Sequence, residues 1–228
     1  MGSIIQPIYK DSVIVCTGTG PSINEHQINT INQARAEGKI KVFSSNRAWE
    51  IFDSDLVHGC NYQYWDIWWN QPTDKGLILK DQPFLKYTTR PELEGKYPGL
   101  NYIKEIWIDG LSRDPSCISA HHGTGPQTVN LAYLFGAKTI LLVGWDMRFP
   151  GKVDNRTYTE KRRYLGEDKQ TLTHWPRTGP NGEQEGLIRE METIHPKDYG
   201  IEIINCTPDS AMTHFPMMDL DDALRNYV

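Results

Sequence analysis

An apolar run that ends in a glycine-rich corner limits the possible folds of this chain more than any other feature. Val13 to Thr17 are apolar or β-branched, and a set of small residues follows them directly: Gly18, Thr19, Gly20, Pro21 and Ser22. Ser22 and Glu25 have the spacing of a helix capping box, and Gly38 stands where the next helix would end. The pattern predicts a strand, a tight corner and a helix.

A corner of this kind can bind an anion. Backbone N–H groups and the positive end of the helix dipole meet there, which suits a phosphate group. The alternative is that the glycines only permit a tight turn. We interpret the corner as part of a nucleotide site.

The composition excludes several classes of protein. The chain has 228 residues, of which 38% are hydrophobic and 11% aromatic, enough for one α/β domain over residues 1–228. No apolar run approaches the roughly 20 residues of a membrane span. The N-terminus has no signal-sequence pattern, so we expect a cytoplasmic protein. The net charge of -5 argues against nonspecific nucleic-acid binding, and the four scattered cysteines have no metal-binding spacing.

A second glycine corner precedes the most apolar strand. Gly123, Thr124 and Gly125 introduce a predicted helix, and Thr139 to Val143 form a continuous apolar run after it. Such a run is typical of a strand covered on both faces, and hence of a parallel sheet. The alternation of strands and helices predicts a Rossmann-like α/β fold with a mostly parallel central sheet and helices on both faces.

Three polar residues follow predicted strands and should lie on one edge of this sheet. They are Asn46, Asn61 and Asp146. Ligands of open α/β sheets bind at the carboxyl ends of the strands, so all three are candidate ligand contacts. Each is explained equally well as a turn residue.

Other stretches have weaker patterns. Tyr62, Trp65 and Trp69 share a face at helical spacing, and we expect most of them to pack in the core. Residues 71–119 are irregular, with short strands expected near residue 78 and over 102–108, at an edge of the sheet. The last elements expected are a helix over 183–195, a strand over 201–204 and a helix over 219–227.

A polar, charged segment follows Asp146. It spans about residues 148–180 and has Arg162, Arg163 and Tyr164 at its centre. A stretch of this kind is often a solvated loop. Because it comes directly after the edge where ligands bind, we interpret it as a lid insertion that closes over a ligand.

Several common nucleotide and hydrolase motifs are missing. The dinucleotide fingerprint fails because Ile23 stands where a third glycine belongs and Asn46 where an acidic residue belongs. The P-loop and the Gly-x-Ser-x-Gly motif do not occur. Asp53 and Asp55 imitate a metal-binding Asp-x-Asp, but they precede a strand, so we interpret them as structural.

Taken in order, the remaining motifs resemble those of the sialyltransferase-like proteins. They are the strand and corner at residues 13–22, Asn46, the loop at 123–125, the sequence Val143 to Asp146, and the pair His174–Trp175. That superfamily includes the family 42 sialyltransferases, the motility accessory factors and the archaeal pterin diphosphokinases. The chain is most similar to a branch of small bacteriophage proteins. The resemblance covers nearly the whole chain and implies a Rossmann-like nucleotide-sugar site that requires no metal or other cofactor.

The resemblance also implies roles for single residues. His174 corresponds to the general base, since a neutral imidazole with a pKa of roughly 6.5 can accept a hydroxyl proton. A packing role is the alternative explanation of the pair His174 and Trp175. His121 and His122 are competing candidates for the general base. The implied donor contacts are Gly18, Thr19, Gly20, Pro21, Ser22, Asn46, Asn61, Gly123, Thr124, Gly125 and Asp146, with Arg162, Arg163 and Tyr164 at the leaving phosphate. Two features differ from the family: His121 and His122 precede the second corner, and Tyr158 and Tyr164 match a phosphate-binding tyrosine pair only loosely.

The sequence therefore predicts an inverting glycosyltransferase that moves a sugar from a nucleotide-activated donor to a hydroxyl acceptor. An ATP-dependent diphosphokinase of the pterin type and a catalytically silent nucleotide-binding protein stay open as alternatives. A phage origin would make a hydroxymethylated DNA base a plausible acceptor and the host cytoplasm the location. A homo-oligomer is also compatible with the sequence.

Overall fold

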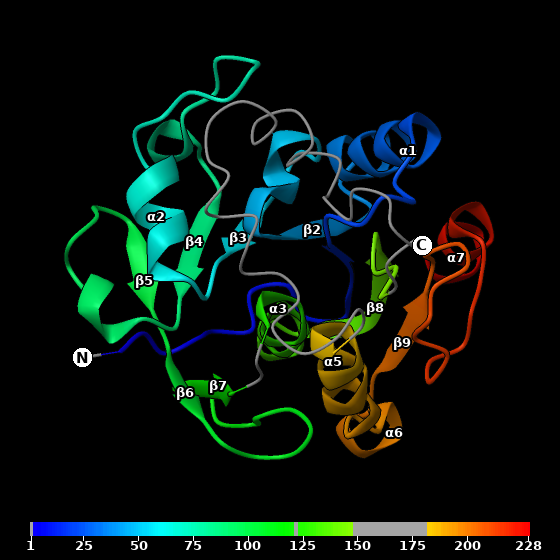
Figure 1. Cartoon of the computed structure of the whole chain (residues 1–228). Coiled ribbons are helices and arrows are strands. Elements are labelled where there is room, and N and C mark those ends of the chain that lie inside the picture. The colour runs from blue at the N-terminus through cyan, green and yellow to red at the C-terminus, as the bar shows by residue number, and fades with distance from the viewer. Residues whose placement is uncertain (1, 121–122, 148–181) are drawn as a thin grey trace.

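The computed structural model describes residues 2–120, 123–147 and 182–228. At its centre is a seven-stranded sheet of order β5-β4-β3-β2-β1-β8-β9, in which every neighbouring pair is parallel (Figure 1). Its strands are Ser12–Thr17 (β1), Lys41–Ser45 (β2), Leu56–His58 (β3), Leu85–Thr88 (β4), Leu100–Tyr102 (β5), Ala137–Val143 (β8) and Glu202–Asn205 (β9). Lys104–Ile106 (β6) and Cys117–Ser119 (β7) form a separate parallel pair. The predicted parallel α/β sheet is confirmed.

Helices cover both faces of this sheet. The α-helices are Glu25–Ala36 (α1), Tyr62–Trp68 (α2), Thr124–Leu134 (α3), Gly182–Glu192 (α5), Pro196–Tyr199 (α6) and Leu220–Tyr227 (α7). Short 3-10 turns span Asn46–Glu50 (η1), Leu79–Asp81 (η2) and Pro91–Leu93 (η3). In the described ranges no helix has both the length and the apolar content that crossing a membrane requires.

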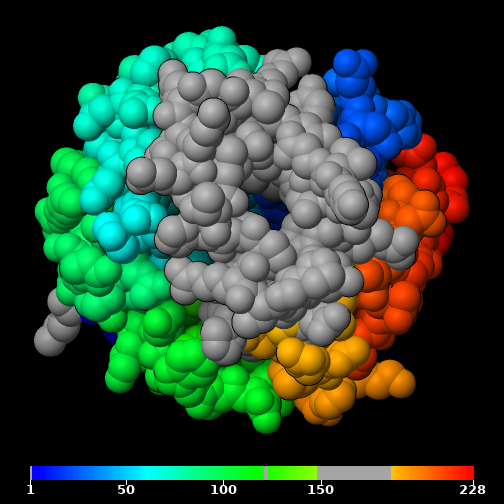
Figure 2. All heavy atoms as spheres, in the orientation of Figure 1, coloured from blue at the N-terminus to red at the C-terminus, as the bar shows by residue number. Residues whose placement is uncertain are grey.

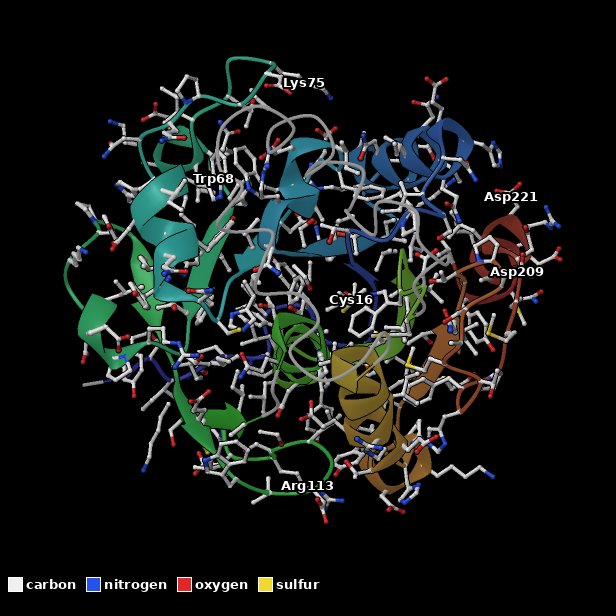
Figure 3. The ribbon with its side chains drawn as sticks, in the orientation of Figure 1. Cys16, Trp68, Lys75, Arg113, Asp209 and Asp221 are labelled. Atoms are coloured by element: carbon white, nitrogen blue, oxygen red, sulfur yellow. The ribbon has the colours of Figure 1, made fainter. Side chains whose placement is uncertain are left out.

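The strand β1 divides the core into two layers. Ile14 and Cys16 pack with residues of α3 and α5, whereas Val13 and Val15 pack with residues of α1 and α7. This alternation is the period of two that a strand imposes on its side chains. Figure 3 labels Cys16 in the middle of the molecule, between the helices of the two layers. Burial on both faces explains why β1 and β8 are continuous apolar runs.

A third, aromatic cluster lies at the β5 end of the sheet. It consists mainly of residues from α2 and the segments beside it: Trp49, Tyr64, Trp65, Trp68, Trp69 and Leu79. Figure 3 labels Trp68 on α2. Trp65 and Trp69 are buried, whereas Tyr62 is 47% exposed, so the prediction that most of these three residues pack in the core is confirmed. The helix is short and begins at Tyr62, whose side chain therefore lies at the open end of the cluster.

Some predicted boundaries were also wrong. The N-cap of α1 is Asn24, which forms a reciprocal capping box with Gln27, and Ser22 lies outside the helix. Strand β4 was not predicted, and Ile78 forms only an isolated bridge with Pro72. The helix expected over 183–195 ends at Glu192, after which Pro196 begins the short α6. The proposed lid over 148–180 lies outside the described residues.

Candidate functional site

The order of the strands reverses between β1 and β8. The chain runs from β1 outward to β5 on one side, and β8 and β9 lie on the other side. Strands β1 and β8 are paired along their length, with Thr17 opposite Val143 at their carboxyl ends. In open α/β sheets a ligand-binding crevice forms at such a switch point. Figure 2 shows that segments distant in sequence border one face of the molecule, among them α1 in blue and α5 in yellow.

The first glycine corner packs directly against the end of β8. A Cβ atom on Gly18 would lie 2.4 Å from the carbonyl oxygen of Gly144. A Cβ atom on Gly20 would lie 2.6 Å from that same oxygen and 1.8 Å from Oδ2 of Asp146. No real side chain tolerates these distances, so glycine is required here by close approach within the protein.

Asp146 is bonded to this corner through Ser22. The backbone N–H of Ser22 donates to Asp146 Oδ1 at 3.0 Å, and the Ser22 hydroxyl donates to Oδ2 at 2.9 Å. The structure therefore brings together Gly18, Gly20, Ser22 and Asp146, with Thr19 and Pro21 in the same loop. The carboxylate stands where an anion would approach the Ser22 N–H. A hydroxyl group, which can donate to the carboxylate, suits this position better than a phosphate.

The side chain of Trp145 lies against both glycine corners. Its side chain is buried, and its indole Nε1–H donates to the carbonyl of Cys16 at 2.9 Å. A Cβ atom on Gly125 would lie 2.8 Å from the indole ring, and one on Gly18 would lie 3.4 Å from it. Trp145 was not among the predicted site residues, although it directly precedes Asp146. Its indole ring packs against both corners.

The second corner contacts the end of β2. The Thr124 hydroxyl donates to Asn46 Oδ1 at 3.2 Å and lies 3.1 Å from the Cys60 sulfur. Asn46 has a φ of 51°, a left-handed conformation that asparagine adopts more readily than most residues. Gly123 is the N-cap of α3 and provides no side-chain cap. Asn46, Gly123, Thr124 and Gly125 therefore lie together at the start of α3.

The remaining predicted contacts divide into two groups. Asn61 caps α2, since its Oδ1 accepts a hydrogen bond from the Gln63 N–H at 2.9 Å, so its side chain already has a structural role. The others lie outside the described residues: His121, His122, Tyr158, Arg162, Arg163, Tyr164, His174 and Trp175. Within the described ranges, no group of three or more His, Cys, Asp or Glu side chains has the arrangement of a metal site.

A buried histidine network was missed by the sequence analysis. His58 is fully buried at the end of β3, with Nδ1 3.0 Å from the carbonyl oxygen of Tyr87 and Nε2 2.8 Å from Gln127 Oε1. Gln127, in the first turns of α3, donates through Nε2 to Glu105 Oε2 at 3.1 Å. Burial lowers the pKa of His58 to about 4, despite these partners, so the ring is neutral at physiological pH. The residues around His58 in the sequence carry no signal of these distant partners.

A separate hollow lies beside the first corner, between α1 and α7. It has a volume of about 360 Å³, and Asn24, Thr207 and Met218 are among the residues that line it. His26 and Asp221 also border it and form an ion pair at 2.9 Å when the histidine is protonated. This hollow lies next to α7 and offers a competing location for a ligand.

Comparisons with known proteins give one result on the fold. No family model and no curated protein sequence matches the chain. A solved structure of a MAf glycosyltransferase from Magnetospirillum magneticum AMB-1 is similar, with a TM-score of 0.57 and 13% sequence identity. The match covers 95% of this chain and 35% of that one, so this chain spans about a third of the length of that protein. At this identity the likeness shows a shared fold.

Proposed function

We propose that the protein is a glycosyltransferase that moves a sugar from a nucleotide-activated donor to a hydroxyl acceptor, with inversion at the anomeric carbon. The observation that carries the proposal is the meeting of both glycine corners, Asn46 and Asp146 at the switch point between β1 and β8. Nucleotides bind at such points in Rossmann-like sheets. The fold shared with a solved glycosyltransferase supports the same assignment.

In the proposed complex, the ribose of the donor binds at the first glycine corner and its phosphate binds at the second. The Asp146 carboxylate would accept hydrogen bonds from ribose hydroxyls at the first corner. The phosphate would lie at the start of α3, where the N–H groups of Thr124 and Gly125 have no side-chain cap. Asn46 would contact the nucleotide between them.

The chemistry requires a base and a group that stabilises the leaving phosphate. His174 would take the proton of the acceptor hydroxyl as its oxygen attacks the anomeric carbon, while the bond to the phosphate oxygen breaks. Arg162, Arg163 and Tyr164 would neutralise the charge that develops on this phosphate. Both roles rest on the resemblance described above.

A thermal-shift screen of CMP, CDP, UDP, GDP and ATP, with and without Mg²⁺, tests the proposal. A ligand at a hundred times its Kd stabilises the folded state by roughly 2.7 kcal/mol, which gives a readily measured shift in Tm. We expect CMP, CDP, UDP or GDP, the nucleotide part of a sugar donor, to raise the Tm in the absence of a metal. A shift with ATP alone that requires Mg²⁺ would favour the diphosphokinase. No shift with any nucleotide would contradict the proposal.

The general base has its own test. His174→Ala should leave donor binding near the wild-type value and lower turnover by roughly two to four orders of magnitude. Wild-type activity should also fall as the pH drops through the histidine pKa. Normal turnover in His174→Ala together with a loss in His122→Ala would move the base to the second corner and leave the nucleotide site unchanged.

A further inference from the structure

Arg90 lies just beyond the carboxyl end of β4. Strand β4 ends at Thr88, and the strands of the central sheet are parallel, so Arg90 lies at the same edge of the sheet as Asn46 and the first glycine corner. The Arg90 N–H donates to the Thr88 hydroxyl at 3.3 Å, which holds the chain as it leaves the strand. Arg90 was not among the predicted site residues, and the proposed chemistry does not use it.

A contact with the backbone directs the Arg90 side chain toward the second corner. Its Nε donates to the carbonyl oxygen of Cys60. Cys60 in turn contacts the first residue of α3, since its sulfur lies 3.1 Å and its backbone nitrogen 3.4 Å from the hydroxyl oxygen of Thr124. Arg90 is therefore connected to the start of α3 through one residue.

The positive charge of Arg90 also acts at this corner. Burial raises the pKa of the Cys60 thiol, whereas the Thr124 hydroxyl and the charge of Arg90 oppose that rise. Glu105 has the opposite effect on the thiol, but its carboxylate is bonded to Gln127 and forms no ion pair with Arg90. In the described part of the chain, no other carboxylate pairs with Arg90 either.

The two terminal nitrogens of Arg90 are accessible to a ligand. No described residue accepts a hydrogen bond from them. In the described ranges, the side-chain polar atoms that are buried without a partner are Arg47 Nη1 and Thr89 Oγ1. The terminal nitrogens of the half-buried Arg90 are not among them, so they reach the surface. A partly desolvated guanidinium group without a counter-charge is suited to an anionic ligand.

Unused hydrogen-bonding capacity gathers at this edge of the sheet. Thr89, immediately before Arg90, is 1% exposed, and Arg47, directly after Asn46, is 4% exposed. Each has the side-chain atom without a partner named above. Leaving such atoms unpaired is costly, so their place at the carboxyl ends of β2 and β4 indicates that a polar ligand or water completes this edge.

The start of α3 needs further donors if it is to bind a phosphate. Its first two residues are Thr124 and Gly125, and the third is Pro126, which has no backbone N–H. The helix therefore offers fewer free N–H groups than a helix N-terminus usually does. The terminal nitrogens of Arg90 supply additional N–H groups, together with a full positive charge.

We propose that Arg90 binds the phosphate of the nucleotide donor at the start of α3. The proposal rests on the proposed function, because it requires a nucleotide at the switch point. Nη1 and Nη2 would donate charge-assisted hydrogen bonds to the phosphate oxygens, while Nε stays bonded to the Cys60 carbonyl and holds the group in place. A planar guanidinium group suits this task better than an ammonium group, because it can donate two parallel hydrogen bonds.

The test compares nucleotides with their nucleosides by isothermal titration calorimetry. The probes are CMP with cytidine, UDP with uridine and GDP with guanosine. Arg90→Gln should weaken the bound nucleotide by roughly 10- to 100-fold, the range for a lost hydrogen bond to a charged group, and leave the nucleoside within about twofold. Arg90→Lys, which keeps the charge, should weaken the nucleotide by roughly three- to tenfold.

Arg113→Gln is the matched control. Arg113 is an exposed arginine on the loop between β6 and β7 and is labelled in Figure 3. Like Arg90, it donates to a backbone carbonyl, that of Asp198. The substitution removes the same charge and the same kind of bond away from the second corner, so both affinities should stay within about twofold of the wild type. Melting curves of each variant confirm that it is folded.

Salt dependence distinguishes a phosphate contact from a structural role. Raising NaCl from about 50 to about 300 mM should weaken nucleotide binding less in Arg90→Gln than in the wild type, because the variant lacks the charge that salt screens. A side chain that only held Cys60 in place would change the affinity for the nucleotide and leave its salt dependence as in the wild type.

The outcomes for Arg90 and for the proposed function are separate. If the wild type binds a nucleotide and Arg90→Gln binds it as tightly, the role of Arg90 is refuted while the nucleotide site stands. The same holds if Arg90→Gln weakens nucleotide and nucleoside equally and keeps the salt dependence of the wild type. If the wild type binds no nucleotide, both proposals fall.

Discussion

The burial of His58 makes the stability of the fold depend on pH in a calculable way. Burial, the largest cause, lowers its pKa from 6.5 to about 4 in the folded protein. In the unfolded chain the ring has its ordinary pKa, so between these two values the unfolded state binds a proton that the folded state does not. Acidification therefore favours unfolding. The stability that His58 contributes is complete above about pH 6.5 and is lost as the pH falls toward 4.

The size of this effect follows from the difference in pKa. A difference of 2.5 units corresponds to about 3 kcal/mol of unfolding free energy once the pH has fallen to 4. At pH 4.5 the expected loss is slightly smaller, about 2.5 kcal/mol, because two pKa units separate this pH from the unfolded value. Carboxylates titrate in the same range, so a matched variant is needed to isolate the histidine.

Urea unfolding of the wild type and of His58→Gln at pH 7, 5.5 and 4.5 provides this comparison. Glutamine does not titrate, so the stability gap between wild type and variant should shrink by about 2.5 kcal/mol between pH 7 and 4.5. His195→Gln, at an exposed histidine that caps no helix with its side chain, should follow the wild type at each pH. A gap that stays constant or widens on acidification would refute the reasoning.

Three further predictions concern stability at pH 7, each measured by urea unfolding. Gly20→Ala should lower the free energy of unfolding by about 1–3 kcal/mol, because its Cβ overlaps Asp146 and the end of β8. The control Gly186→Ala, in open space on α5, should raise it by about 0.5–1 kcal/mol. Equal effects of the two substitutions would contradict the packing of the corner. Asp146→Ala should cost about 1–3 kcal/mol because the N–H of Ser22 loses its acceptor, and an unchanged midpoint would show that this bond contributes nothing. Glu50→Ala should cost about 3–5 kcal/mol by leaving Arg47 buried without its counter-charge, and a cost below 1 kcal/mol would show that water reaches the guanidinium.

Local patterns were sufficient to predict the centre of the fold. The apolar runs of β1 and β8 are buried on both faces. A continuous apolar run is typical of a strand in a parallel sheet, so these two runs were enough to predict the sheet type. Strand β4 carries no such signal, because it is short and contains Lys86. That lysine is buried only because its ammonium donates to the carbonyls of Gln82 and Phe84. No sequence pattern in residues 85–88 indicates these hydrogen bonds, which compensate for the burial of the lysine.

The details of the site depended on contacts between distant residues. Ser22 and Glu25 have capping-box spacing, yet Ser22 bonds Asp146, which lies 124 positions away, and Asn24 takes the cap. The link from His58 to Gln127 spans 69 positions and has no sequence signature. The strand order that brings such residues together is fixed by packing of the whole chain, so spacing alone could not predict these pairs.

Hydrogen exchange with and without a saturating nucleotide tests the central claim most directly. The nucleotide is the one that gives the largest shift in the thermal screen. We predict added protection in peptides that cover residues 17–23, 44–47, 123–128 and 143–147, the loops at the carboxyl ends of β1, β2 and β8 and the start of α3. Peptides of α7 should be unchanged. Protection confined to α7 and residues 206–208, which border the competing hollow, would contradict the placement of the nucleotide at the switch point.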